Sequence, residues 1–178
     1  MRWLLSTTML LLMPLAGASP LVLDGENRVL GYYSNWQSPT SLEYATSLSG
    51  YRFLFERLSG KIYSYANYLE ISYASDDCTG PMLLADYVPP GYLMPLYGGF
   101  DNENPAPLVY IPQVPVHVIA ASTASFVNHA GGCQKDNRNP ANYYVALFND
   151  PITTGINGSI FASPARVASQ RMFFDGFD

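Results

Sequence analysis

Few side chains in this chain stand in patterns that could carry out catalysis. Asp76 and Asp77 are its only pair of adjacent acids, and His117 lies between two valines in a strand-like stretch. Two carboxylates and an imidazole could serve a small hydrolase by general acid–base chemistry, and adjacent carboxylates could also bind calcium. The alternative is a turn, in which short acidic side chains hydrogen-bond to nearby backbone and Gly80 relieves the bend. We expect the turn for the two acids and a partly exposed strand position for His117, so no residue is assigned as catalytic.

Other patterns for catalysis or metal binding are absent from the sequence. There is no Gly-x-Ser-x-Gly elbow and no Ser-x-x-Lys pair that would prepare a serine nucleophile. His117 and His129 do not have the spacing of a helical zinc pair. Residues 101–104 carry oxygen ligands that calcium could use, but their order matches no known calcium loop. We therefore predict neither a metal nor a cofactor.

The two cysteines, Cys78 and Cys133, are expected to form one disulfide. In an oxidising compartment a single pair of cysteines is bonded by default. Metal or redox chemistry is the alternative, but neither cysteine has a neighbour at C-x-x-C spacing. Closing a loop of this length would stabilise the fold by roughly 4 kcal/mol in the chain-entropy treatment.

The N-terminus indicates export. Met1–Arg2 is followed by an apolar run from Trp3 to Leu15 and then by Ala16–Gly17–Ala18. This order of a positive end, an apolar centre and small residues is typical of a cleaved secretory signal peptide. A membrane anchor is the alternative, but the run is shorter than the ~20 residues of a spanning helix. We expect cleavage after Ala18 and a secreted, periplasmic or surface-associated protein.

Charge and aromatic content narrow the range of partners. The net charge is −5 and the basic residues are scattered, so no basic stripe is available to neutralise the phosphates of a nucleic acid. Tyrosine combines a flat apolar ring with a polar tip, which suits sugars and proteins. Tyr87, Tyr92 and Tyr97 lie among prolines and are expected to be exposed, as candidates for ligand binding. The alternative is that these rings fill or edge a β core.

Short apolar runs separated by turn residues predict strands. Alternation over 51–58, a turn at Ser59–Gly60 closed by left-handed Gly60, and a return at 61–65 indicate a hairpin that continues as a meander to Ser75. Prolines between 81 and 115 favour short edge strands and loops over central strands. We expect further strands at 21–23, 29–33, 38–48 (allowing a helical turn), 108–111, 116–121, 125–128, 143–148 and 159–162, and a polar loop at 135–140.

These elements predict a single all-β domain, an antiparallel sandwich or partly open barrel of short strands with one disulfide. Residues 19–165 would form it, after a signal peptide at 1–18 and before a C-terminal tail at 166–178. The tail holds three phenylalanines among its last six residues, which are costly to leave in water. It is interpreted either as a docking segment or as a final strand or arm folded onto the domain.

Two local stretches are similar to small exported bacterial β-proteins of unknown function. The stretch from Tyr73 to Gly80 resembles their Tyr-x-Ser-x-Asp-Cys-x-Gly strand end, which a second cysteine follows, as Cys133 does here. The last six residues resemble a Phe-x-Asp-Gly-Phe-Glu ending on many exported proteins of Gram-negative bacteria, with Asp178 in place of glutamate. These resemblances imply export and β architecture, and they bring no catalytic residue.

Together the patterns favour an exported, non-enzymatic β module that acts by binding or structural contact at the cell envelope or outside the cell. A glycan-binding module that uses exposed tyrosines is one alternative. A small secreted hydrolase built on Asp76, Asp77 and His117 is another. The expected partners are protein or glycan and not nucleic acid, and no integral membrane segment is expected once the signal peptide is removed.

Overall fold

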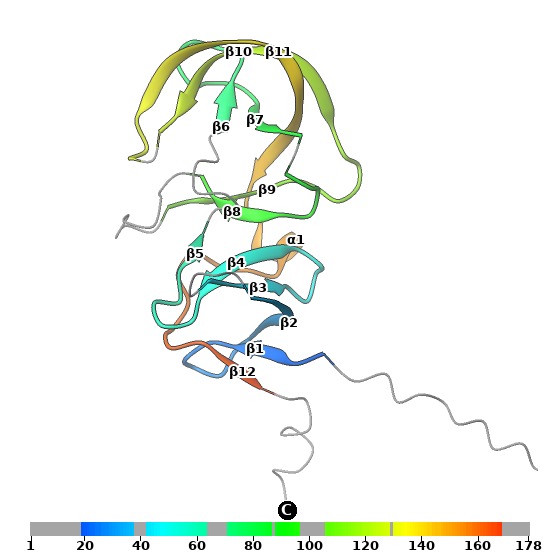
Figure 1. Cartoon of the computed structure of the whole chain (residues 1–178), viewed down its shortest axis with the longest axis vertical. Coiled ribbons are helices and arrows are strands. Elements are labelled where there is room, and N and C mark those ends of the chain that lie inside the picture. The colour runs from blue at the N-terminus through cyan, green and yellow to red at the C-terminus, as the bar shows by residue number, and fades with distance from the viewer. Residues whose placement is uncertain are drawn as a thin grey trace, which may run out of the picture.

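The computed structural model describes residues 19–37, 42–63, 71–86, 88–96, 106–128 and 130–168. In these ranges the chain forms two six-stranded sheets of short, mostly antiparallel strands. Figure 1 shows the two sheets stacked along the long axis of the molecule. The predicted all-β antiparallel class, with a barrel-like part and one disulfide, is confirmed.

The first sheet contains the predicted opening hairpin and, beside it, the last strand that the structure describes. Its spatial order is β12 (Arg166–Ala168), β1 (Leu21–Leu23), β2 (Val29–Gln37), β3 (Leu42–Thr46), β4 (Arg52–Glu56) and β5 (Ile62–Tyr63). The strand predicted within 38–48 is confirmed as β3, while residues 38–41 lie outside the described ranges. Because β12 pairs with β1, the folded body extends to Ala168, past the boundary predicted at residue 165.

Strand β4 of the β4–β5 hairpin is buried on both of its faces. Phe53 and Phe55 alternate with Leu54 along β4, and all three side chains are buried. The two phenylalanines join one core cluster and Leu54 joins a second. The turn closes through Gly60, which has the predicted left-handed conformation (φ 69°). A Cβ at Gly60 would overlap the carbonyl oxygen of Phe161, so the position requires glycine.

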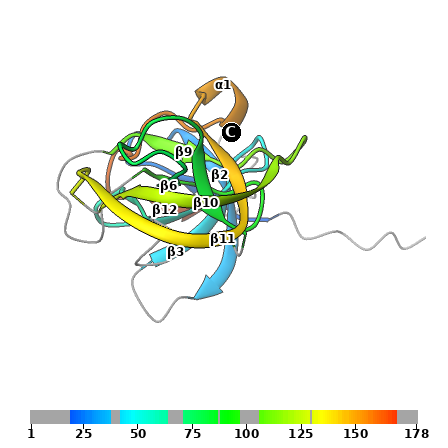
Figure 2. The same ribbon diagram turned by 90° about the horizontal axis from the view of Figure 1, so that it is seen from above.

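The second sheet contains a closed ring of strands. Its spatial order is β10 (Val118–Val127), β6 (Ile71–Tyr73), β7 (Met82–Ala85), β11 (Cys133–Phe148), β9 (Leu108–Tyr110) and β8 (Leu93–Pro95). β10 and β11 also pair with each other, which closes β10, β6, β7 and β11 into a small barrel-like ring. Figure 2 shows these two long strands curving across the top of the molecule. The predicted meander is wrong at its third strand, because β6 leaves the β4–β5 hairpin and enters this sheet.

Two further expectations for the second sheet are wrong. Strands β7 and β9 each have neighbours on both sides, although central strands were not expected among the prolines. The prolines stand between these strands, and the one inside a strand, Pro95, is in β8 at the sheet edge, where its missing N–H costs no ladder bond. The polar loop predicted at 135–140 is instead part of β11. The sequence did not indicate a strand there because a two-stranded ribbon that is exposed on both faces shows no alternation of apolar residues.

The end of the chain differs from the sequence-based prediction in one more place. Instead of a strand at 159–162, Ile160 makes only an isolated bridge to Lys61, and the last strand of the described residues is β12.

The core joins the two sheets. One buried cluster combines Leu42, Tyr44 and Leu54 of the first sheet with Leu84 and Val109 of the second. A backbone hydrogen bond from Arg52 N to Gly91 O (2.8 Å) connects β4 to the residues that lead into β8. The sheets are therefore one packed body. Among the described residues, no helix has the length and apolar character needed to cross a membrane.

Candidate functional site

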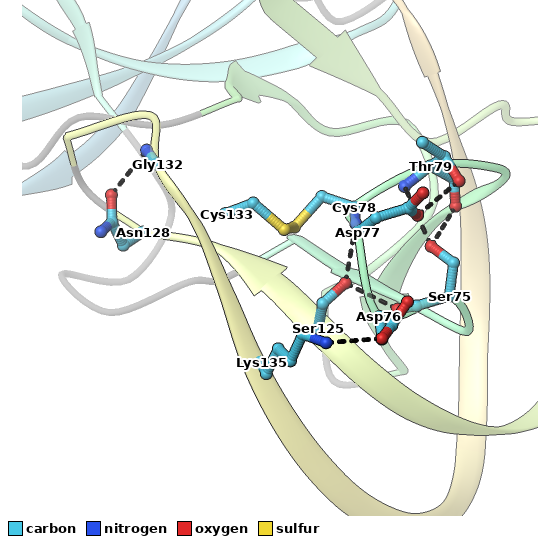
Figure 3. Close-up of a disulfide and its surroundings, with 10 residues drawn as sticks. All are labelled: Ser75, Asp76, Asp77, Cys78, Thr79, Ser125, Asn128, Gly132, Cys133 and Lys135. Carbon is cyan, nitrogen blue, oxygen red and sulfur yellow. Dashed lines mark hydrogen bonds and ion pairs between the residues drawn. A yellow bond between two sulfur atoms is a disulfide. The ribbon is translucent and has the colours of Figure 1, made fainter.

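The predicted disulfide is present and pins a loop to the long hairpin. Cys78 and Cys133 are bonded, with their Cα atoms 5.8 Å apart. Cys78 belongs to the loop between β6 and β7, and Cys133 is the first residue of β11, as Figure 3 shows. The bond joins two segments that β10 already brings together, since β10 pairs with both β6 and β11.

Asp77 is used to hold the turn, as predicted. Its Oδ1 accepts a hydrogen bond from the Thr79 hydroxyl (2.6 Å) and one from the Thr79 N–H (3.2 Å). The hydrogen bond from the Thr79 hydroxyl is the main reason that the pKa of Asp77 lies below its ordinary value. The Ser75 hydroxyl in turn donates to the Thr79 carbonyl oxygen (2.7 Å). The carboxylate is thereby kept ionised as an acceptor inside its own loop.

Asp76 is engaged elsewhere. Its Oδ2 lies 2.6 Å from Nζ of Lys135 on β11, and both side chains are exposed (Figure 3). This hydrogen bond and the charge of Asp76 raise the pKa of Lys135. Beside them, the buried Ser125 hydroxyl accepts from the Cys78 N–H (3.0 Å) and donates to the Ser75 carbonyl (2.7 Å). The loop is therefore fixed by three kinds of bond: covalent, ionic and hydrogen bonds.

The structure does not bring the three proposed hydrolase residues together. His117 is exposed and precedes β10, where its carbonyl oxygen accepts from Val145 N (3.0 Å). The loop of Asp76 and Asp77 docks at Ser125, toward the other end of β10. At about 3.3 Å per residue, roughly 26 Å of strand separates the two places. The predicted strand position of His117 is wrong by one residue, because β10 begins at Val118.

The one tyrosine candidate that the structure describes is not exposed. Tyr92 retains 6% of its accessible surface and lies in the second core cluster, so the prediction of an exposed ring is wrong. Its backbone bridges to Arg52 of β4, and its ring packs in the core between the two sheets. With Tyr44 and Arg52 it lines a hollow of about 150 Å³, below the roughly 300 Å³ of the smallest usual ligand pockets. Tyr87 and Tyr97 lie outside the described residues.

A larger hollow lies where β11 ends. Its volume is about 440 Å³, and it is lined by Ala106, Pro107, Leu108, Phe148, Asn149, Pro151, Asn157, Gly158 and Ser159. We call it the Phe148 depression. Phe148 exposes 61% of its surface although it is a large apolar side chain. A hollow of this size could receive one bulky side chain or a small ring.

A tightly bonded turn shapes this depression. Asn149 N donates to Leu108 O (2.8 Å), and the Asn149 side chain donates to Ile156 O (2.9 Å) and accepts from the Thr154 hydroxyl (2.6 Å). Asp150 caps the one-turn helix α1 (Pro151–Thr154), and hydrogen bonds from Thr153 and from the Ile152 N–H lower the pKa of Asp150. These bonds hold Phe148 and Pro151 at the rim, so the hollow exists before any partner arrives.

The lining of the Phe148 depression is suited to contact with an apolar group. None of its lining residues carries a charge, and most of the lining is apolar. No sequence pattern predicts this depression, because it combines three separate segments and Phe148 resembles any apolar residue at the end of a strand. Nowhere in the described ranges do three or more His, Cys, Asp or Glu side chains gather as metal ligands. No protein-family model, curated protein or solved structure matches this chain.

Proposed function

We propose that this protein acts by contact and not by catalysis, and that the Phe148 depression receives an apolar side chain of a protein partner. The observation that carries the proposal is a 61% exposed phenylalanine at the rim of an uncharged hollow. Burying such a side chain is worth about 1.5–3 kcal/mol, and exposed apolar surface of this kind marks interaction sites. An uncharged hollow favours an apolar group because a charged one would lose its hydration without gaining a partner.

The arrangement of the acidic residues supports the same function. Asp77 accepts bonds from its own turn and Asp76 pairs with Lys135, so both carboxylates serve the pinned loop. A disulfide and a signal-like N-terminus also support an action outside the reducing cytosol. We therefore place the proposed contact at the cell envelope or outside the cell.

Site-specific photo-crosslinking in the producing cell tests this proposal. A photoreactive residue at position 148 is expected to trap a discrete protein product. The matched control carries the same residue at Leu58, which is 78% exposed in the β4–β5 turn. Asn157 is exposed and lines the hollow. Adding Asn157→Asp to the position-148 variant places a charge there and should reduce the yield of the crosslinked product at least several-fold. Identical products from positions 148 and 58, or a product indifferent to Asn157→Asp, would contradict the proposal.

A further inference from the structure

The sequence contains a single Asn-Gly pair, Asn157–Gly158, and both residues line the Phe148 depression. The pair follows helix α1, which is drawn in orange in Figure 1. In such a pair the backbone nitrogen of the glycine can attack the side-chain amide carbon of the asparagine, because glycine has no Cβ to obstruct the approach. In a folded protein this attack depends on how firmly the two residues are held.

Neither reacting group is held by a hydrogen bond. Within the part of the chain that the structure describes, the Gly158 N–H and the Asn157 side-chain amide have no hydrogen-bond partner. Both residues are exposed. Gly158 has φ 81°, and a Cβ built on it would meet no heavy atom within 4 Å. The Asn157 side chain therefore has open space in which to rotate toward the following backbone nitrogen.

The residues on either side of the pair are fixed. Ile156 is buried, and its carbonyl oxygen accepts a hydrogen bond from the Asn149 side chain (2.9 Å). Ser159 is also buried, and its carbonyl oxygen accepts from the Ile62 N–H of β5 (2.8 Å). Asn157 and Gly158 are a short exposed span between these two anchors and belong to no helix or strand. The reaction therefore needs bond rotation within this span and not the opening of a sheet.

We propose that Asn157 is a site of spontaneous deamidation, which makes the Phe148 depression anionic as the protein ages. The Gly158 nitrogen loses its proton to hydroxide and forms a bond to Cγ of Asn157. The bond between Cγ and the side-chain nitrogen then breaks, and that nitrogen leaves as ammonia after taking a proton from water. One water molecule opens the resulting succinimide ring at either carbonyl, which leaves aspartate or isoaspartate at position 157.

The product places a charge where the depression has none. A side-chain or isoaspartyl carboxyl group is ionised at neutral pH, and no residue that lines the depression carries a charge to pair with it. The chain becomes one unit more negative than its net charge of −5. An apolar group that enters would displace water from this carboxylate, which opposes the contact. This effect on contact rests on the function proposed above, whereas the reaction itself does not.

A second asparagine of the same depression has the opposite arrangement. The Asn149 side chain donates to Ile156 O (2.9 Å) and accepts from the Thr154 hydroxyl (2.6 Å). The residue that follows it is Asp150, whose Cβ hinders attack by the backbone nitrogen. We therefore expect Asn149 to keep its amide while Asn157 loses its own, so that Asn149 is an internal control.

Peptide mapping of the purified full chain, with its native disulfide intact, tests the reaction. After incubation, mass spectrometry should find an acid in place of the amide at position 157 and an unchanged amide at position 149. The conversion should be faster at mildly alkaline than at neutral pH, because the Gly158 nitrogen must lose its proton. A synthetic peptide of residues 155–160 gives the rate of the unconstrained pair, and the folded chain should react within several-fold of that rate.

The matched control is Asn157→Gln, whose longer side chain closes a larger ring much more slowly and should keep its amide. An intact amide at position 157 of the folded chain, under conditions in which the peptide reacts, would overturn the proposal because the fold would then protect the pair. Equal conversion at positions 149 and 157 would also overturn it.

The effect on contact is measured in the producing cell after synthesis is stopped. The yield of the product crosslinked from position 148 should fall at least several-fold as the acid accumulates at position 157. With Asn157→Gln the yield should not decline with time, whatever its initial value. A failure to obtain any discrete product from position 148 contradicts the proposed function and leaves the mass measurement of deamidation intact. A constant yield despite full conversion contradicts the effect of the charge on contact.

Discussion

Asp24 shows how one side chain can fix a hairpin. Its Oδ1 accepts hydrogen bonds from the N–H groups of Glu26 (2.9 Å) and Arg28 (2.8 Å), and its Oδ2 pairs with Nε of Arg28 (2.7 Å). The side chain is fully buried. Burial by itself would raise the pKa of Asp24, but these donors outweigh it and hold the pKa below its ordinary value. The turn between β1 and β2 is therefore organised around an ionised carboxylate.

We predict that Asp24→Asn lowers the free energy of unfolding at pH 7 by about 1–3 kcal/mol, since a buried acceptor of several donors is weakened. A lowered folded pKa contributes stability that is present above the unfolded pKa near ~3.9 and is lost as the pH falls through the folded pKa. The difference between wild type and variant should therefore shrink on acidification. Urea unfolding at neutral pH and near pH 3 measures it, and an equal loss at both would contradict the assignment.

Ser125 carries a second prediction. Its buried hydroxyl accepts from Cys78 N and donates to Ser75 O, so Ser125→Ala leaves two backbone groups without this partner. We expect a loss of about 1–3 kcal/mol in unfolding free energy. Asp76→Asn is the matched control, since it removes only an exposed ion pair and should barely move the thermal midpoint. Equal effects of the two substitutions would show that the hydroxyl does not hold the loop.

At the level of elements, local patterns succeeded where one strand face is buried against its neighbour. Phe53 and Phe55 lie on one face of β4 in the first core cluster, and Gly60 takes the conformation that its hairpin requires. The prediction of a loop at 135–140 was wrong because these residues lie in a ribbon with little burial. Apolar and polar residues alternate in a sequence only where one face of a strand is buried. The disulfide could be predicted from compartment and cysteine number alone.

The disulfide should stabilise the fold mainly by lowering the conformational entropy of the unfolded chain. We predict that the double variant Cys78→Ala/Cys133→Ala loses roughly 4 kcal/mol or less in unfolding free energy. The native loop should persist, because the bonds of Ser125 and the Asp76–Lys135 pair remain. Guanidinium unfolding gives the loss in free energy, and amide hydrogen exchange at positions 78 and 79 reports whether the loop persists. Complete loss of protection there would mean that the bond itself holds the native turn.

At the scale of the whole molecule, the second core cluster couples the sheets. Leu54 of β4 packs in it with residues of β7 and β9, and it is buried. Contacts that join elements far apart in the sequence favour a single cooperative transition. Neither sheet is then expected to unfold alone.

Leu54→Ala tests this coupling. We expect a loss of about 2–5 kcal/mol from the cavity that it leaves. Protection from hydrogen exchange should fall in both sheets together, including β7, which does not pair with β4. Reduced protection confined to the first sheet would show that the two sheets unfold separately.

The arrangement of strands was beyond local sequence reasoning. The pairing of β6 with β10, or of β12 with β1, joins segments far apart, and no turn type or periodicity records such a partner. The Phe148 depression has the same origin, because segments near residues 107, 149 and 158 meet only in the finished fold. The prediction that Tyr92 is exposed was wrong for a related reason. A tyrosine is amphipathic wherever it occurs, and the local sequence does not show whether a second sheet packs over its ring.

The pairing of β12 with β1 has a consequence for biosynthesis. A ribosome delivers the polypeptide from its N-terminus, so β1 has no outer neighbour until the final strand has emerged. The first sheet can be completed only after translation has passed Ala168. Until then the first sheet lacks its edge strand, and the outer backbone groups of β1 have no strand to pair with.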